Sequence, residues 1–173
     1  SVTHGGWTPA QQQELKFKRV LAGEGFYEAC NYSFYSPKDF DLFRLPEDAP
    51  ERRAIRILNP IGEDLSVMRT FLAPAMLQNV VRNVRRGNAE GRLFELANAY
   101  LAEELPLKAL PKENKRVTLA VWGDNDFFDL KGAVEAVAES FSLRLSFGRG
   151  EKPCLHPGKT ALIRMGEREV GWM

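Results

Sequence analysis

Two groups of residues have the types and spacings that chemistry would need. Gly148-Arg149-Gly150 has the glycines of a phosphate-binding loop, but Pro153 follows where the helix of such a loop would begin, so the segment predicts a hairpin turn. Asp124, Asp126 and Asp129 could bind a hard cation, yet the other ligands of a calcium loop are missing. That acidic group therefore predicts a loop followed by a helix N-cap.

Thiol and imidazole side chains are few and scattered along the sequence. Cys30 and Cys154 lie outside any Cys-x-x-Cys spacing, and His4 and His156 are equally isolated, so neither a disulfide framework nor a zinc site is indicated. Cys30 falls within a predicted strand, which favours a small buried apolar residue over a nucleophile, because neither histidine is placed to activate it. His156, beside two prolines, is predicted to lie in a loop. The residues taken alone thus predict no catalytic group and no metal ligand.

Arg82, Arg85 and Arg86 crowd the end of a predicted helix. Unpaired basic residues at one helix end are suited to contact a nucleic-acid backbone. The alternative is that they compensate the helix dipole and present a solvated face. Both hypotheses stay open at this point.

Composition limits the classes of protein to consider. With 173 residues, 44% of them hydrophobic, the chain can bury one substantial core, which predicts a single globular domain. The formal net charge of +1 gives no long-range attraction to nucleic acid or to an anionic membrane, so any RNA contact would have to be local. No apolar run approaches the roughly 18 residues of a membrane span. Residues 1–7 lack the regions of a signal peptide, and a cytoplasmic location is expected.

The stretch Leu58 to Leu77, LNPIGEDLSVMRTFLAPAML, combines a turn, an acidic pair, a lone arginine and a second proline. The pattern predicts a turn at Asn59-Pro60 and a strand at Val67-Met68. A helix must then start near Phe71, because Pro74 is tolerated only in the first helical turn. For Arg69 two hypotheses remain, a local salt bridge to Glu63 or Asp64 and a contact with a partner protein.

This helix is unusually apolar, and Gly87 is predicted to end it. Its hydrophobic positions recur every three or four residues: Leu72, Met76, Leu77, Val80, Val81 and Val84. They spread wider than one core-facing stripe, as if the helix served both the core and a partner. The alternative is that it is the central helix of the domain.

The other elements follow from capping residues and hydrophobic periodicity. Thr8-Pro9-Ala10-Gln11 predicts a capped helix that ends at Gly23 or Gly25. The remaining predictions are strands at 26–35, 55–57, 92–101, 116–122, 143–147 and 161–165, and helices from Ser36 to about Phe43 and from Asp129. Strands with few helices and no regular βαβ alternation favour an α+β fold with an antiparallel or mixed sheet and helices against it.

Several of these segments resemble one known family. The run LNPIGEDLSVMRTFLAPAML, followed by RLFELANAYL and by FFDLKG before a helix, resembles the catalytic-core-like domain of the phenylalanyl-tRNA synthetase beta subunit. TPAQQQELKFKRVLAGEGFYEACNYSF resembles the opening of that domain, and LHPGKTALI with VGW resembles its later strands. The resemblance covers nearly the whole chain. Gly62 and Ala75 stand where the family more often has Ser and Gly, which leaves local turn detail open.

The resemblance implies a class II aminoacyl-tRNA synthetase core, an antiparallel sheet flanked by helices. Residues 59–83 would be the counterpart of motif 1, a strand and helix used at subunit interfaces, and residues 92–101 would stand where motif 2 begins. The interface residues expected from it are Asn59, Pro60, Met68, Arg69, Leu72, Met76, Leu77 and Val80.

The resemblance also implies that this core supports catalysis by another chain. In the family, the alpha subunit activates phenylalanine and the beta core is a degenerate copy, so the expected partners are the alpha subunit and tRNA(Phe). Arg92 has the character of the motif 2 arginine, but no glycine-rich, arginine-ending motif 3 occurs before Met173. No cofactor is expected in this domain, whereas the holoenzyme would use ATP and magnesium.

The family's core continues beyond VGW, so residues 1–173 are expected to be one domain excised or truncated from a longer beta chain. Two alternatives to a non-catalytic scaffold remain. One is an autonomous adenylate-forming, ligase-type enzyme on the same fold, and the other is an RNA-binding module. The steep salt dependence expected of an RNA-binding module fits poorly with a net charge near zero.

Overall fold

The computed structural model describes residues 5–173, so the prediction for His4 lies outside the described residues. The helices are α1 (Pro9–Gly23), α2 (Lys38–Leu42), α3 (Ala73–Arg85) and α4 (Phe127–Ser140), with short 3-10 turns at Pro50–Arg52 and Glu63–Leu65. The strands are β1 (Tyr27–Glu28), β2 (Phe34–Tyr35), β3 (Val67–Met68), β4 (Gly91–Leu101), β5 (Lys112–Trp122), β6 (Ser146–Arg149), β7 (Ala161–Met165) and β8 (Arg168–Trp172). Within residues 5–173, no helix combines the length and apolar character that crossing a membrane requires.

Three small sheets organise these strands. The first has the order β1-β4-β5, with β1 parallel and β5 antiparallel to β4. The second pairs β2 with β3, and the third has the order β6-β7-β8, both with antiparallel neighbours. The fold is therefore α+β with mixed sheets, as predicted.

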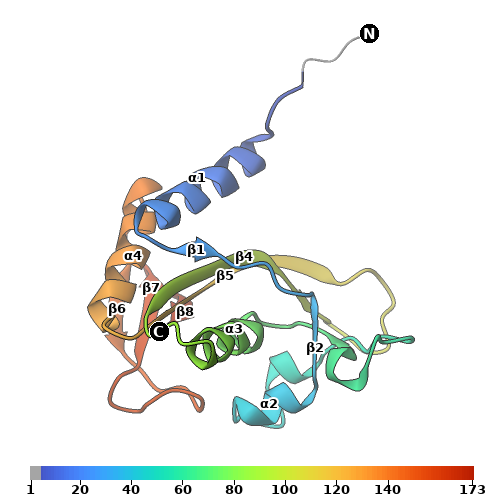
Figure 1. The fold of residues 1–173 in the computed structure, drawn as a ribbon. Coiled ribbons are helices and arrows are strands. Elements are labelled where there is room, and N and C mark those ends of the chain that lie inside the picture. Colours follow the sequence, from blue (N-terminus) through green and yellow to red (C-terminus); the bar gives the residue numbers. More distant parts are fainter. Residues whose placement is uncertain (1–4) are drawn as a thin grey trace.

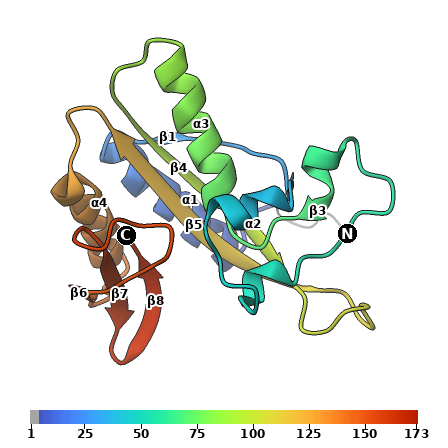
Figure 2. The ribbon, with the colours of Figure 1, turned by 90° about the horizontal axis from the view of Figure 1, so that it is seen from below.

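The β4–β5 hairpin is the centre of the molecule (Figure 1). Phe94 on β4 is almost fully buried and packs with Leu21 of α1, with Phe26 and with Ala133 of α4. Since side chains alternate between the faces of a strand, the neighbours of Phe94 point to the opposite face. There α3 crosses the hairpin, so α1 with α4 and α3 cover opposite faces (Figures 1 and 2).

Local sequence signals explain where the helices begin and end. Thr8 caps α1, and Gln11 completes the predicted capping box. Pro74 occupies the first turn of α3, and after the helix Gly87 adopts a φ of +88°, a left-handed conformation that glycine reaches without a steric penalty. The predicted capping box of α1, the place of Pro74 in the first turn of α3 and the end of α3 at Gly87 are confirmed.

The start of α4 was predicted too late. Its N-cap is Asp126, whose carboxylate accepts hydrogen bonds from the N-H groups of Phe128 and Asp129 at 2.7 and 3.1 Å. Asp129 is not the N-cap. It is the third residue of the helix, and its carboxylate accepts a hydrogen bond from the backbone N-H of Asp126, which completes the capping box. The predicted loop with a helix N-cap is thus confirmed at Asp126.

The predicted strand at 26–35 is wrong in its middle. Its two ends are β1 and β2, which join different sheets, and residues 29–33 between them are not in a strand. Cys30 is in this connection and is exposed, so the prediction of a buried apolar residue is also wrong. Residues 26–35 alternate between two kinds of side chain as a strand does, but no single neighbouring strand pairs with all ten of them.

Two further predictions need correction. Gly148 and Arg149 belong to β6, and the β6–β7 connection comes only after them, so Gly148-Arg149-Gly150 is a strand end and not a hairpin turn. A Cβ at position 150 would lie 2.3 Å from Cγ of Leu162, so any residue other than glycine would force the Leu162 side chain to move. The predicted strand at 55–57 is reduced to one bridge, between Arg56 and Val67.

Candidate interface around helix α3

The residue before α3 that had no settled role, Arg69, is buried in the centre of a polar network. Its Nη1 donates to Oε1 of Glu95 on β4 at 2.9 Å, and the two side chains are only 6% and 3% exposed. Its Nε donates to the carbonyl oxygen of Asn98 at 2.8 Å, and Nη1 also reaches that of Tyr32 at 3.3 Å. Arg69 thus ties the start of α3 to β4 and to the segment 29–33.

Glu95 has further partners that complete this network. Its carboxylate accepts from the backbone N-H of Asn31 at 3.3 Å and from Nδ2 of Asn31 at 2.9 Å. Oδ1 of Asn31 in turn accepts from Nδ2 of Asn79 on α3 at 3.0 Å. A buried ion pair needs such additional hydrogen bonds to offset its desolvation.

Both hypotheses for Arg69 are therefore corrected. Glu63 and Asp64 are exposed and are not its partners, and a guanidinium buried among Glu95, Asn98 and Tyr32 is not available to another protein. Its carboxylate partner is 26 positions away in the sequence.

Helix α3 presents one face to the core and a second, apolar face to solvent. Leu72 and Met76 are 4% and 2% exposed. Leu77, Val81 and Val84 are 50%, 46% and 52% exposed. At about 100° per residue these three fall within an arc of about 60°. We call Leu77, Val81 and Val84 the apolar flank.

The structure places the eight predicted interface residues in three different environments. Arg69, Leu72 and Met76 are buried inside the chain, where Met76 belongs to the core. Met68 and Val80 are half-buried. Asn59, Pro60 and Leu77 are exposed, although the first two lie in the loop before β3 and not on α3. Val81 and Val84, which the hydrophobic spacing in the sequence singled out but the predicted interface residues did not include, are exposed on the same side of α3 as Leu77.

A different flank of α3 carries polar and basic side chains. Asn79 contacts Asn31 as described, and Arg82 and Arg86 follow it by three and seven residues, so they lie on the same side of the helix. We call Asn79, Arg82 and Arg86 the cationic flank. Arg82, Arg85 and Arg86 are all exposed.

Arg92, the residue with the character of a motif 2 arginine, is held by other side chains. Its Nε donates to Oδ1 of Asn125 at 2.6 Å, and its Nη2 donates to Oδ1 of Asp129 at 2.7 Å. The guanidinium also lies over the ring of Phe26. Backbone hydrogen bonding at Asp126, together with the charge of Arg92, lowers the pKa of Asp129. The guanidinium of Arg92 therefore serves the contact between β4 and α4.

A second small core beside α2 contains the titratable side chain of Tyr35, and the buried carboxyl group of Asp39 lies beside it. Its buried residues are Tyr35, Phe40, Ala54 and Val67. The hydroxyl of Tyr35 lies 2.7 Å from Oγ1 of Thr70, and burial raises the pKa of Tyr35 to about 12. Burial likewise raises the pKa of Asp39, whose Oδ2 is buried without a hydrogen-bond partner among the described residues.

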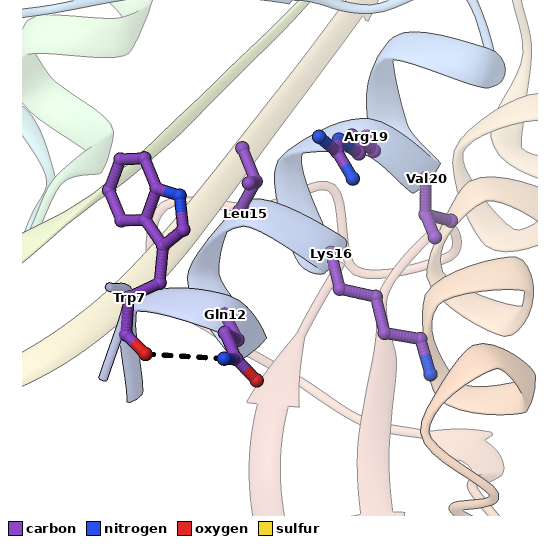
Figure 3. A pocket seen from close by; sticks show the side chains of 6 residues that line it. All are labelled: Trp7, Gln12, Leu15, Lys16, Arg19 and Val20. Carbon is purple, nitrogen blue, oxygen red and sulfur yellow. Dashed lines mark hydrogen bonds between the residues drawn. The ribbon is translucent and has the colours of Figure 1, made fainter. Parts of the chain in front are cut away.

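Two hollows lie outside the apolar flank of α3, although the second reaches the start of the helix at Leu72 and Ala73. One, of about 470 Å³, lies beside α1 and is lined by Trp7, Gln12, Leu15, Lys16, Arg19 and Val20 (Figure 3). It is shaped by the helix start, where Nε2 of Gln12 donates to the carbonyl oxygen of Trp7 at 3.2 Å. The other, of about 550 Å³, lies between β5, α4 and β8 and has mainly apolar walls. No cluster of His, Cys, Asp or Glu suited to a metal ion occurs in residues 5–173.

Comparisons with known proteins agree on one family. The sequence profile described as "Phenylalanyl tRNA synthetase beta chain CLM domain" matches residues 1–173. The phenylalanine–tRNA ligase beta subunits of Clostridium acetobutylicum and Clostridium tetani are 40% and 36% identical over 168 residues. Each alignment covers 96% of this chain and 21% of the relative, so the chain spans about a fifth of these relatives.

Solved structures show the same fold at low sequence identity. A crystal structure of pyrrolysyl-tRNA synthetase from Desulfitobacterium hafniense has a TM-score of 0.68 and 18% identity, and the match covers 91% of this chain and 56% of that one. A second structure of a pyrrolysyl-tRNA synthetase from the same organism has a TM-score of 0.66, also at 18% identity. At this level of identity the likeness concerns the fold alone.

Proposed function

Because the chain belongs to the family of phenylalanyl-tRNA synthetase beta chain CLM domains, we propose that it is a non-catalytic scaffold on a class II synthetase core. Its role is to assemble with a catalytic alpha subunit and thereby support the aminoacylation of tRNA(Phe). The observation that carries the proposal is the apolar flank of α3, three half-exposed aliphatic side chains on a helix that the core already anchors. Such a patch, rigid and apolar, is suited to a subunit interface.

The fixed position of α3 strengthens this proposal. The Arg69–Glu95 pair and the Asn31–Asn79 bond hold the helix at its start and near its middle. A helix that is already ordered loses little conformational entropy when a partner binds, which favours affinity. The exposed aliphatic side chains are therefore presented in a defined orientation.

The environment of Arg92 supports a scaffold over an enzyme. A class II adenylation site needs an arginine free to meet the α-phosphate, because the transition state gathers negative charge there. Arg92 is engaged by Asn125, Asp129 and Phe26 instead. On this proposal ATP and magnesium act only in the catalytic subunit.

The test compares charged substitutions on two sides of α3. Leu77→Asp and Val81→Asp should weaken association with a phenylalanyl-tRNA synthetase alpha subunit at least about tenfold, the size expected of a central apolar contact. Gln78→Asp is the matched control, because Gln78 is exposed but points about 100° away from Leu77. Met76→Asp is unsuitable, since Met76 is a core residue and its replacement would unfold the domain.

Co-purification and calorimetric titration would measure the association, with circular dichroism to verify folding. Folded Leu77→Asp and Val81→Asp variants that bind the alpha subunit as tightly as Gln78→Asp would refute the interface. Tight binding of ATP or phenylalanyl-adenylate to this chain alone would refute the scaffold and support an autonomous enzyme.

A further inference from the structure

We draw no further inference here: the strongest candidate, the mainly apolar groove between β5, α4 and β8, is an unpartnered surface, and nothing in the structure shows what covers it.

Discussion

Replacing Arg69 by methionine is the most direct test of how this fold is held together. Arg69→Met removes the ion pair with Glu95 and the hydrogen bonds to Asn98 and Tyr32, and it leaves a carboxylate that is 3% exposed without its cation. Removal of one member of a buried ion pair costs about 3–5 kcal/mol, because the remaining charge is still desolvated. We expect a loss of that size in the free energy of unfolding.

Urea denaturation at pH 7, followed by far-UV circular dichroism, would measure this loss. Lys108→Met is the control, since its ion pair with Glu104 is 77% and 53% exposed and should contribute less than about 1 kcal/mol. The double variant Arg69→Met/Glu95→Gln should recover a large part of the loss, because glutamine removes the uncompensated charge but keeps an oxygen for Asn31.

Two outcomes would contradict the argument. A loss below about 1 kcal/mol in Arg69→Met would mean that the network is not needed to hold α3 on β4. No recovery in the double variant would mean that the lost hydrogen bonds of Arg69, and not the unpaired carboxylate, set the cost.

Three other substitutions concern stability alone. Asp39→Asn should stabilise the protein by about 1 kcal/mol at pH 7, because it removes a buried carboxylate charge that has no cationic partner among the described residues. Burial raises the pKa of Asp39, so the wild-type carboxyl group destabilises the fold least when it is protonated. The stability gained by Asp39→Asn should therefore shrink as the pH falls through that pKa. A gain in the free energy of unfolding that stays constant from pH 7 to pH 4 would contradict this cause. Gly132→Ala, in open space within α4, should stabilise by about 0.5–1 kcal/mol. Gly150→Ala should destabilise the protein by about 1–3 kcal/mol, because its Cβ would meet the side chain of Leu162. The midpoint of thermal unfolding should therefore rise in Gly132→Ala and fall in Gly150→Ala.

Features set by neighbouring residues were predictable from the sequence. The capping box of α1 and the start of α3 depend only on residues within one helical turn, namely Thr8 with Gln11 and Pro74. The α+β class followed from the order of the elements. The spacing of three or four residues in the sequence identified the apolar positions of α3, but it did not show which of them face the core and which face solvent.

Features set by distant residues were not predictable in the same way. Residues 26–35 alternate like one strand, but Glu95 binds Asn31 and draws the middle of the segment out of the ladder. β5 begins at Lys112 instead of Arg116, because residues 112–115 pair with residues 98–101 of β4 while the charged side chains of Lys112, Glu113 and Lys115 stay exposed. For Arg69, only the folded chain could show that its partner is Glu95.

The division of α3 into flanks changes which residues matter for function. Met76 and Leu77 are adjacent and both hydrophobic, yet Met76 is 2% and Leu77 is 50% exposed. A substitution at Met76 therefore reports on folding, whereas one at Leu77 reports on association. The same logic separates Asn79, which is bonded to Asn31, from Arg82 and Arg86, which are exposed. Since the buried network fixes the rotation of the helix, it also fixes which side chains belong to the apolar flank, so Arg69 and Glu95 govern the proposed interface without touching the partner.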